Sequence, residues 1–306
     1  MEGNERGRQM NIGKGATKRM TSVLREMMAQ PGIIVIPGIG GPLPAKIMER
    51  AGFKMVNLGG YDMGAYLVTS EPLMCLEEVT RIARYITAAI SIPLMVDAGA
   101  GFGEPLHVMR TVRELENAGV AAIHVEDQIF PKRAHYHKGV EHIIPAADMI
   151  AKIKAALAAR KDPDFVIAAR TDAMRSHDYA EGIRRANLYL EAGADMVLVY
   201  PNNAEEARKT PKEIRGPVSY LNSVGNLLDR PLFTTQDLED MGYKAVTYGI
   251  GATIVAAKAV KELADKIYAL QRPVMDAEEM RAMRRYIEVT IGLNRMYEIE
   301  KETVEG

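Results

Sequence analysis

Eight short apolar segments recur along the chain, and the stretches between them carry the spacing of amphipathic helices. The segments are almost continuously apolar, whereas a strand with one solvated face would alternate apolar and polar residues. This pattern is typical of strands buried on both faces, in a parallel sheet that is covered by helices. In chain order the segments are Ile33–Pro37, Met55–Gly60, Ile92–Ala98, Ala121–Asp127, Phe165–Asp172, Met196–Pro201, Val218–Asn222 and Ala245–Gly249.

The helical stretches support the same fold. Glu104–Ala118 places Val108, Val112 and Leu115 on one face and charged residues on the other, and Leu76–Ile90 repeats the pattern. Eight alternations of strand and helix predict a closed (β/α)8 barrel of the TIM type with right-handed crossovers. An open, doubly wound sheet is the rival architecture, but it usually needs fewer strands.

A single domain is expected over residues 1–306, with the barrel over residues 30–270 and a C-terminal helical extension over residues 271–306. Two helices are predicted after the eighth strand, at Ala252–Leu270 and Ala277–Gly292. A closed barrel needs no further helix, so we expect the extension to pack on a neighbouring subunit. This contact would bury its apolar side chains, which include Met283, Tyr286, Ile287, Val289 and Ile291.

Composition narrows the class of protein. The 306 residues are 47% hydrophobic and 26% charged, and the formal charge of −1 provides no field that would attract nucleic acid or an anionic membrane. The single cysteine, Cys75, cannot form an internal disulfide, and no His/Cys cluster has zinc-ligand spacing. No apolar run reaches the roughly 20 residues of a membrane span. The first 21 residues are polar, unlike a signal peptide. We therefore expect a cytoplasmic protein. Its methionines, which include Met20, Met27 and Met28, are expected to fill the core.

Acidic side chains stand at the carboxyl ends of the third and fourth segments, where barrels of this type carry their chemistry. Asp97 and Glu126 supply the hard oxygen ligands that Mg²⁺ or Mn²⁺ prefers, and few protein ligands suffice because the ion keeps several waters. Such an ion can bind the carboxylate and carbonyl of a 2-oxo acid and stabilise the enolate formed when a bond breaks. Asp97 and Glu126 are therefore the predicted metal site.

Further residues at the same rim suit a carboxylic-acid substrate. Arg170, near the end of the fifth segment, can hold a carboxylate by two parallel hydrogen bonds. Gly59 and Gly60 allow backbone N–H groups to approach an anion closely. The acids Asp127 and Asp172 have an alternative interpretation, since either could pair with Arg170 or cap a helix.

Four motifs resemble the isocitrate lyase/phosphoenolpyruvate mutase superfamily, and most closely its 2-methylisocitrate lyase branch. They are VEDQIFPKR, DPDFVIAARTDA, EAGAD and PLFTTQDL, which begin at Val125, Asp162, Glu191 and Pro231. The resemblance covers residues 30 to 260, in the right order and spacing. It implies a (β/α)8 barrel whose last helix is swapped between subunits, usually in a dimer of dimers, that is, a homotetramer.

The resemblance also implies functional roles. It implies Mg²⁺ near Asp97, backbone amides at Gly59 and Gly60 that orient an oxyanion, and a substrate carboxylate on Arg170. Residues 132–139 correspond to a mobile loop that closes over the site. Closure of such a loop would exclude water and deliver an acid or base.

The chain departs from the lyase branch at several positions. The loop of that branch reads Lys-Lys/Arg-Cys-Gly-His, and its cysteine protonates the departing enolate, whereas this chain reads KRAHYHKG with Ala134 in that place. Gly99 replaces the second acid of an Asp-x-Asp motif, and Tyr200 replaces a glutamate. Asn57 and Gly59 replace a tyrosine and a serine. These departures argue against ordinary methylisocitrate or isocitrate cleavage.

The altered loop carries its own candidates for proton transfer. His135, Tyr136 and His137 are consecutive proton-active side chains close to Lys132. Histidine titrates near neutrality and suits general acid–base catalysis. Tyr61, after the glycine pair, is a further candidate. The alternative is that the two histidines are merely polar loop residues.

These residues favour a Mg²⁺-dependent carbon–carbon lyase that acts on a small 2-hydroxy or 2-oxo acid, by retro-aldol cleavage or decarboxylation through an enolate. Two alternatives stay open: mutase or hydrolase action on a phosphonopyruvate-like or carboxyphosphonate acid, and a barrel that binds an acid without catalysis. The predicted catalytic residues are Lys132, His135, His137 and Tyr61. The predicted substrate-binding residues are Asn57, Gly59, Gly60, Tyr61, Arg170 and Asn222.

Overall fold

The computed structural model describes residues 18–225 and 230–304. These residues form a closed barrel of eight parallel strands, in which each strand pairs with the next and β8 pairs with β1. Seven of the predicted apolar segments contain a whole strand, and the first, Ile33–Pro37, contains all of β1 except its last two residues. The predicted (β/α)8 barrel is therefore confirmed. The strands are β1 Ile34–Ile39, β2 Val56–Leu58, β3 Leu94–Asp97, β4 Ala122–Glu126, β5 Val166–Arg170, β6 Met196–Leu198, β7 Val218–Leu221 and β8 Ala245–Tyr248.

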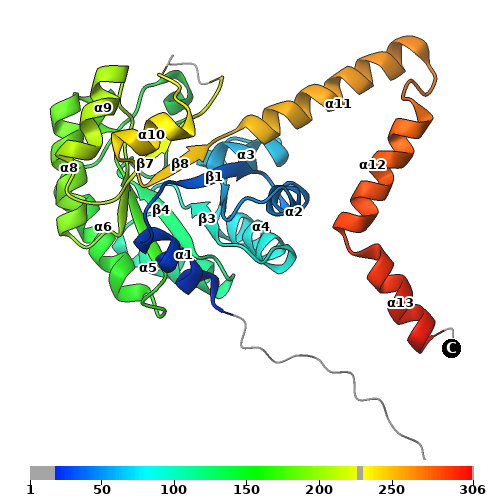
Figure 1. The fold of residues 1–306 in the computed structure, drawn as a ribbon. Coiled ribbons are helices and arrows are strands. Elements are labelled where there is room, and N and C mark those ends of the chain that lie inside the picture. Colours follow the sequence, from blue (N-terminus) through cyan, green and yellow to red (C-terminus); the bar gives the residue numbers. More distant parts are fainter. Residues whose placement is uncertain (1–17, 226–229, 305–306) are drawn as a thin grey trace, which may run out of the picture.

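Helices connect successive strands and cover the outside of the barrel (Figure 1). The two helices predicted in most detail are present as α4 Leu76–Ala89 and α5 Pro105–Asn117. The other connections contain α2 Pro42–Arg50, α3 Gly60–Tyr66, α6 Ala146–Ala159, α7 Ala173–Ser176, α8 Tyr179–Glu191, α9 Ala204–Glu213 and α10 Thr235–Met241. Two short 3₁₀ helices, η1 Glu71–Leu73 and η2 Ala134–Lys138, lie in the loops that follow β2 and β4.

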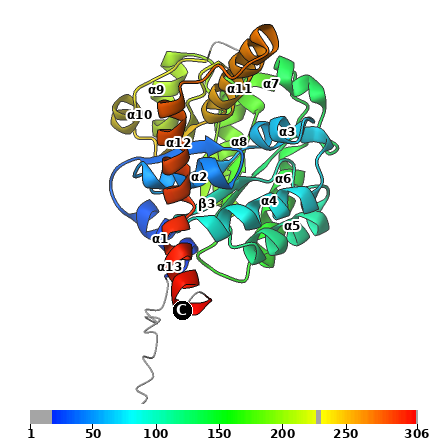
Figure 2. The ribbon, with the colours of Figure 1, turned by 90° about the vertical axis from the view of Figure 1, so that its right-hand side faces the viewer.

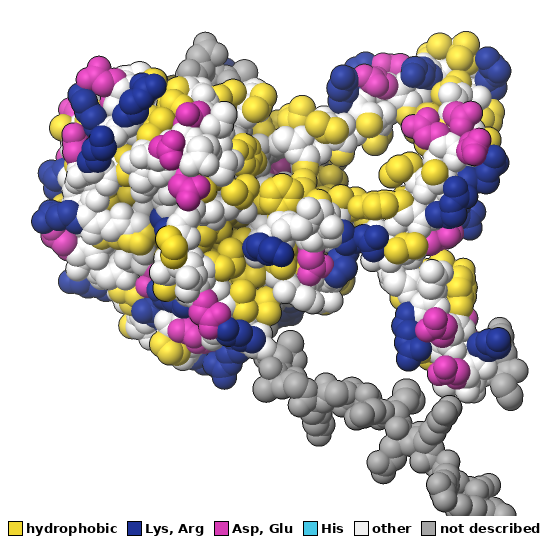
Figure 3. Space-filling model, viewed as in Figure 1, with side chains coloured by type: hydrophobic (Ala, Val, Ile, Leu, Met, Phe, Trp, Pro, Cys, Tyr) yellow, Lys and Arg dark blue, Asp and Glu magenta, His cyan; other side chains and the backbone are white. Residues whose placement is uncertain are grey.

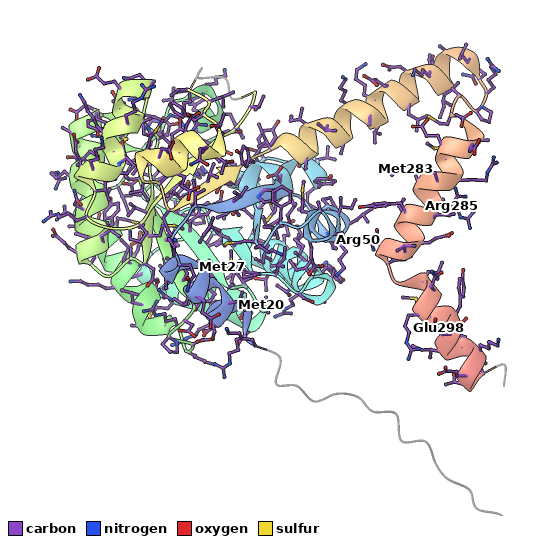
Figure 4. All side chains as sticks on the ribbon, in the orientation of Figure 1. Met20, Met27, Arg50, Met283, Arg285 and Glu298 are labelled. Carbon is purple, nitrogen blue, oxygen red and sulfur yellow. The ribbon has the colours of Figure 1, made fainter. Side chains whose placement is uncertain are left out.

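A helix that precedes the barrel, α1 Met20–Ala29, packs against the amino-terminal end of the barrel interior (Figure 4). Leu24 of α1 is 2% exposed and belongs to the cluster of apolar side chains that fills this interior. Met20, Met27 and Met28 are partly buried against the same cluster, which confirms that they belong to the core. The helix itself is not among the predicted elements, because the strand–helix alternation begins after it.

Truncation of Leu24 to alanine is expected to lower the free energy of unfolding by about 3 kcal/mol, because it leaves a cavity at the amino-terminal end of the barrel interior. Leu106 on α5 provides a matched control, since its side chain is 78% exposed. Truncation of Leu106 should change the stability by less than about 0.5 kcal/mol. Urea unfolding of the two variants measures the difference. Equal unfolding midpoints would contradict a structural role for α1 in closing the barrel.

Three helices follow the last strand of the barrel, and we call them the C-terminal arm. They are α11 Gly251–Leu270, α12 Ala277–Thr290 and α13 Leu293–Thr303. The first extends away from the barrel and the other two turn back beside it (Figures 1 and 2). The predicted helix at Ala277–Gly292 is present up to Thr290. Gly292 has a positive φ of 77° and separates it from α13, a helix that the sequence pattern does not predict.

The arm carries apolar side chains that face solvent in this single chain (Figure 3). Met283, Ile287, Val289 and Ile291 are 39 to 51% exposed. The arm contacts the barrel at Arg50 of α2, whose guanidinium carbon lies 5.4 Å from the ring centre of Tyr286, and Arg50 points toward α12 in Figure 4. Packing of the arm on a neighbouring subunit stays a prediction.

Across the described residues, no helix combines the length and the apolar character that crossing a membrane requires. Most of the N-terminal segment that we distinguished from a signal peptide, residues 1–17, lies outside the described residues.

Candidate active site

The carboxyl ends of β3, β4 and β5 bring three of the predicted site residues together. Glu126 and Arg170 are partners across β4 and β5, and Asp97 is the partner of His124 across β3 and β4. Glu126 is fully buried, while Asp97 and Arg170 are each 8% exposed. A parallel barrel presents all its strand ends at one rim, so these residues form one cluster although they lie far apart in the sequence.

Asp97 is held at the end of β3 by backbone amides. Its Oδ1 accepts the N–H of Gly99 at 2.9 Å, and its Oδ2 accepts the N–H of Gly60 at 3.3 Å. Burial would raise the pKa of Asp97, but interactions with His124 and Lys132 outweigh it and lower the pKa to about 2. Asp97 is therefore a carboxylate at neutral pH, as a metal ligand must be.

Glu126 lies between two cations. Its Oε1 is 2.9 Å from Nζ of Lys132, and its Oε2 is 3.2 Å from Nη1 of Arg170. Neither oxygen accepts a hydrogen bond of good geometry from the described residues, so these contacts are ionic. Burial raises the pKa of Glu126 to about 7, although both cations act in the opposite direction.

Arg170 connects the fifth strand to its neighbours. Its Nη2 donates to both carboxylate oxygens of Asp172 at 3.1 and 3.2 Å, and its guanidinium carbon lies 4.8 Å from the ring centre of Tyr200. Asp172 is therefore a partner of Arg170, as the alternative interpretation of this acid predicts. Asp127 instead pairs with Arg185 at 3.1 Å. The Nε of Arg170 has no acceptor among the described residues, which leaves a donor for a substrate carboxylate.

The turn after β2 has no room for side chains at its two glycines. A Cβ on Gly59 would lie 2.6 Å from Oδ2 of Asp62, and a Cβ on Gly60 would lie 2.3 Å from Cδ of Glu71. Asp62 is itself fixed, because Oγ1 of Thr253 in α11 donates to it at 2.5 Å. The position of Asp62 therefore gives a steric reason why this chain has glycine where the lyase branch has serine.

Gly60→Ala is expected to weaken the binding of oxalate in the presence of Mg²⁺ about 10-fold while the barrel stays folded. The new methyl group would displace the flexible carboxyl end of Glu71 from its contacts at the rim. The carboxylate of Glu71 would then lose a hydrogen bond, and one hydrogen bond that involves a charged group is worth roughly 1.5–3 kcal/mol. Gly41, which follows β1 at the same rim, is a matched control, because a Cβ there would meet nothing within 4 Å. Calorimetry compares the two alanine variants. Equal affinities would contradict the steric role of Gly60.

Lys132 anchors the loop that follows β4. Its side chain is 4% exposed, and Nζ contacts Oε1 of Glu71 at 2.6 Å as well as Oε1 of Glu126. Burial would lower the pKa of Lys132, but Glu126 and Glu71 outweigh it and raise the pKa. Lys132 is thus an ammonium that holds the loop against the rim.

The predicted histidines of the loop lie at its outer edge. His137 is half-buried, with Nε2 at 3.0 Å from Oγ of Ser70, and its ring centre lies 6.0 Å from that of Tyr61 in an edge-to-face contact. His135 is exposed. Tyr61 is 42% exposed. These three predicted catalytic residues therefore do not join the cluster of Asp97, and their roles stay predictions.

Glu71 of η1 is a residue that the sequence analysis did not identify. Its carboxylate accepts hydrogen bonds from Nζ of Lys132 and from the hydroxyl of Tyr136, both at 2.6 Å. Its Oε1 lies 3.7 Å from the place where a Cβ of Gly99 would stand, so a carboxylate from another element lies beside the position of the missing second acid. A glutamate in a loop carries no motif, and only the fold brings η1 to the rim.

The two predicted asparagines differ in their surroundings. Asn57 is 6% exposed, and its Oδ1 has no hydrogen-bond partner among the described residues. Asn222 donates from Nδ2 to the carbonyl of Phe233 at 2.7 Å and accepts the N–H of the same residue at 3.3 Å. Asn57 therefore has a free acceptor for a substrate, whereas Asn222 uses both ends of its amide to fix the segment before α10.

A small cavity of about 30 Å³ opens at this cluster, lined in part by Glu71, Asp97, Gly99 and Lys132. It exceeds the minimum volume for one water molecule, roughly 10–15 Å³. No three His, Cys, Asp or Glu side chains are grouped as a metal site within residues 18–225 and 230–304, so an ion here would depend on water and substrate oxygens. A larger cavity of about 570 Å³ lies between α4 and α5 and contains none of the predicted site residues.

The amino-acid sequence is similar to that of a known family and to proteins that are named as lyases. The family model described as phosphoenolpyruvate phosphomutase matches residues 24–268. The chain is 36% identical to 2-methylisocitrate lyase of Aeropyrum pernix over 262 residues, which cover 83% of this chain and 82% of that protein. It is 34% identical to 2,3-dimethylmalate lyase of Eubacterium barkeri over 291 residues, which cover 92% of this chain and 98% of that protein.

Solved structures agree with the barrel described above. A crystal structure of 2,3-dimethylmalate lyase, a member of the PEP mutase/isocitrate lyase superfamily, matches with a TM-score of 0.85 and 26% identity, over 94% of this chain and 96% of that one. A crystal structure of phosphonopyruvate hydrolase in complex with oxalate and Mg²⁺ matches with a TM-score of 0.81 and 27% identity, over 94% of this chain and the whole of that one (100%).

Proposed function

The chain belongs to the phosphoenolpyruvate phosphomutase family, and from this premise we propose that it is a Mg²⁺-dependent carbon–carbon lyase. Its substrate would be a small 2-hydroxy or 2-oxo di- or tricarboxylate, and the reaction would pass through an enolate. The observation that carries the proposal is the cluster of Asp97, Glu126 and Arg170 at one rim, next to the backbone N–H of Gly60. The lyase names of the similar proteins favour the same chemistry.

The residues at the rim fit Mg²⁺, or Mn²⁺ in its place. Asp97 is a buried carboxylate beside a cavity of water-molecule size, and both oxygens of Glu126 lack well-formed hydrogen bonds within the described chain. Asp97 would hold the ion, and Glu126 would orient its waters. When bound, the ion would stabilise negative charge on an oxygen of the substrate.

The protein's own groups have separable roles in this proposal. Arg170 binds a substrate carboxylate through Nε, its donor without an acceptor in the described chain. Asn57 accepts a hydrogen bond from the substrate hydroxyl through its unpaired Oδ1, and the backbone N–H of Gly60 holds Asp97 in position for the ion. Lys132 keeps the loop closed and thereby excludes water from the enolate.

Two related reactions use the same cluster. Decarboxylation of an oxaloacetate-like acid is favoured by Ala134, because this reaction does not need the cysteine acid of the lyase branch. Phosphonopyruvate hydrolysis or carboxyphosphonate mutase chemistry is favoured by the similarity to phosphonopyruvate hydrolase. Against it stands the position of Lys132, which is occupied by two carboxylates instead of being open to a phosphoryl group.

We also propose a homo-oligomer, a dimer of dimers, in which the C-terminal arm packs on a neighbouring subunit and covers its exposed apolar side chains. Sedimentation of the full chain and of the chain ended at residue 270, which lacks α12 and α13 of the arm, would test this arrangement: the shorter chain should form smaller assemblies. The proposed compartment is the cytoplasm. The proposed partner is a small carboxylic acid, with no nucleic acid and no membrane.

The proposed activity is tested with a panel of 2-hydroxy and 2-oxo di- and tricarboxylates that includes 2,3-dimethylmalate, 2-methylisocitrate, oxaloacetate and phosphonopyruvate. NMR with and without Mg²⁺ follows the products. Pyruvate with a second acid would support the lyase, pyruvate with CO₂ would support decarboxylation, and phosphate would support the phosphonate alternative. Absence of any Mg²⁺-dependent turnover would contradict the proposed function.

A further inference from the structure

The loop of this chain lacks the cysteine of the lyase branch, so the proton that completes the reaction must come from another group. The loop carries three consecutive proton-active side chains in η2. A 3₁₀ helix has about three residues per turn, so consecutive side chains point in directions roughly 120° apart. The rings of Tyr136 and His137 nevertheless lie against each other, with their centroids 4.0 Å apart, so the contacts of each side chain decide which one reaches the barrel mouth.

The contacts identify which of the three it is. His135 is exposed, and His137 contacts Ser70 and Tyr61 at the edge of the loop. The hydroxyl of Tyr136 instead donates to Oε2 of Glu71 at 2.6 Å. The ring of Tyr136 also lies under the ammonium of Lys132, whose Nζ is 3.9 Å from the ring centre. The phenol is thus the proton-active group of the loop that reaches the rim.

We propose that Tyr136 is the general acid of this enzyme and that Glu71 restores its proton. This inference rests on the proposed lyase function and names the group that protonates the departing fragment.

In the proposed step, each proton that leaves one group is taken up by another. Glu71 takes the proton of the substrate hydroxyl as the bond between C2 and C3 breaks, which leaves a 2-oxo acid and a carbanion stabilised as an enolate. The O–H bond of Tyr136 breaks and a C–H bond forms at that carbon. The resulting phenolate then takes back a proton from Glu71 through their hydrogen bond.

The surroundings of Tyr136 suit an acid that is neutral at every working pH. Burial raises the pKa of Tyr136, and the carboxylate of Glu71 raises it further. The carbanion is a much stronger base than a phenolate, so the transfer to carbon stays favourable. Lys132 offsets the charge of the phenolate while it exists.

The test compares Tyr136→Phe with Tyr85→Phe, which removes a phenolic hydroxyl from an exposed side chain of α4 (64% exposed). The substrate is 2,3-dimethylmalate, whose retro-aldol products are pyruvate and propionate, or another acid of the panel that yields a prochiral carbon. The reaction runs in D₂O with Mg²⁺. NMR measures the rate, and NMR of the product after esterification with a chiral alcohol identifies the face of the product carbon that carries deuterium.

The wild type and Tyr85→Phe should place one deuterium on a single face. Tyr136→Phe should turn over about 100-fold more slowly or worse, which is the lower range for loss of a general acid. Its residual product should carry deuterium on both faces, because the enolate then takes a deuteron from solvent. Binding of oxalate with Mg²⁺ should be retained, which shows that the variant is folded.

Three results would overturn the assignment. Turnover of Tyr136→Phe at the wild-type rate, or stereospecific deuteration by that variant, would exclude the phenol as the acid. Loss of stereospecificity in His137→Ala with its retention in Tyr136→Phe would transfer the role to the histidine. If the wild type itself cleaves no acid of the panel, the proposed function fails together with this inference. A wild type that cleaves one beside an unimpaired Tyr136→Phe refutes the inference alone.

Discussion

Asp97→Ala is expected to abolish the Mg²⁺-dependent binding of oxalate and to reduce turnover by more than about 100-fold, the loss that even outer partners of a metal site can cause. Among the described residues, no lysine or arginine lies at ion-pair distance from Asp97, and its lowered pKa keeps it charged at neutral pH. Its removal takes away the direct protein ligand proposed for the ion. Isothermal calorimetry with oxalate, with Mg²⁺ and with excess chelator, measures the effect.

Asp148→Ala is a suitable control for this experiment, because Asp148 lies in the first turn of α6, on the outer layer of the barrel. It should bind oxalate as the wild type does. Oxalate binding that survives both the chelator and Asp97→Ala would favour the alternative of an acid-binding barrel without metal chemistry. Binding that is lost with the chelator but not with Asp97→Ala would place the ion on other ligands.

Much of the fold could be predicted because buried parallel strands have a strong signature in the sequence. Segments such as Ile92–Ala98 are almost continuously apolar, and the presence of eight of them favours a barrel over an open sheet. Elements outside the alternation gave no comparable signal. Helix α1 packs its methionines against the amino-terminal end of the barrel interior. The spacing of these methionines predicts a buried face only once the barrel interior is known. Gly292 divides the predicted last helix, which the apolar pattern on either side does not reveal.

The site could be predicted to the extent that it lies at strand ends. Asp97, Glu126 and Arg170 follow from the rule that all strands of the barrel end at one rim, and the structure brings them together. The loop residues do not follow from this rule. Which side chain of η2 faces the rim depends on the register of a 3₁₀ turn, and the part played by Glu71 depends on how η1 folds back.

Arg170→Ala is expected to destabilise the protein by about 3–5 kcal/mol and to abolish activity, because it leaves buried carboxylates without their partner. Asp172 and Glu126 are both fully buried, and each has Arg170 within 3.2 Å. A loss of this size should lower the melting temperature by roughly 10 °C. Thermal unfolding measures it, and the oxalate titration reports the loss of the carboxylate-binding guanidinium in the remaining folded protein.

Arg170→Lys separates the two roles of this side chain. A lysine keeps the positive charge between the carboxylates, so most of the stability should return. It has no donor in the place of the guanidinium Nε that is proposed to bind the substrate carboxylate, so activity should stay low. Arg215→Ala provides the surface control, since Arg215 pairs with Glu191 at 2.9 Å while both side chains are more than half exposed. That variant should lose no more than about 1 kcal/mol. If Arg170→Ala were as stable as Arg215→Ala, the carboxylates of the barrel mouth would have to be neutral or hydrated in the folded protein, and the ionic cluster on which the proposed chemistry depends would not exist.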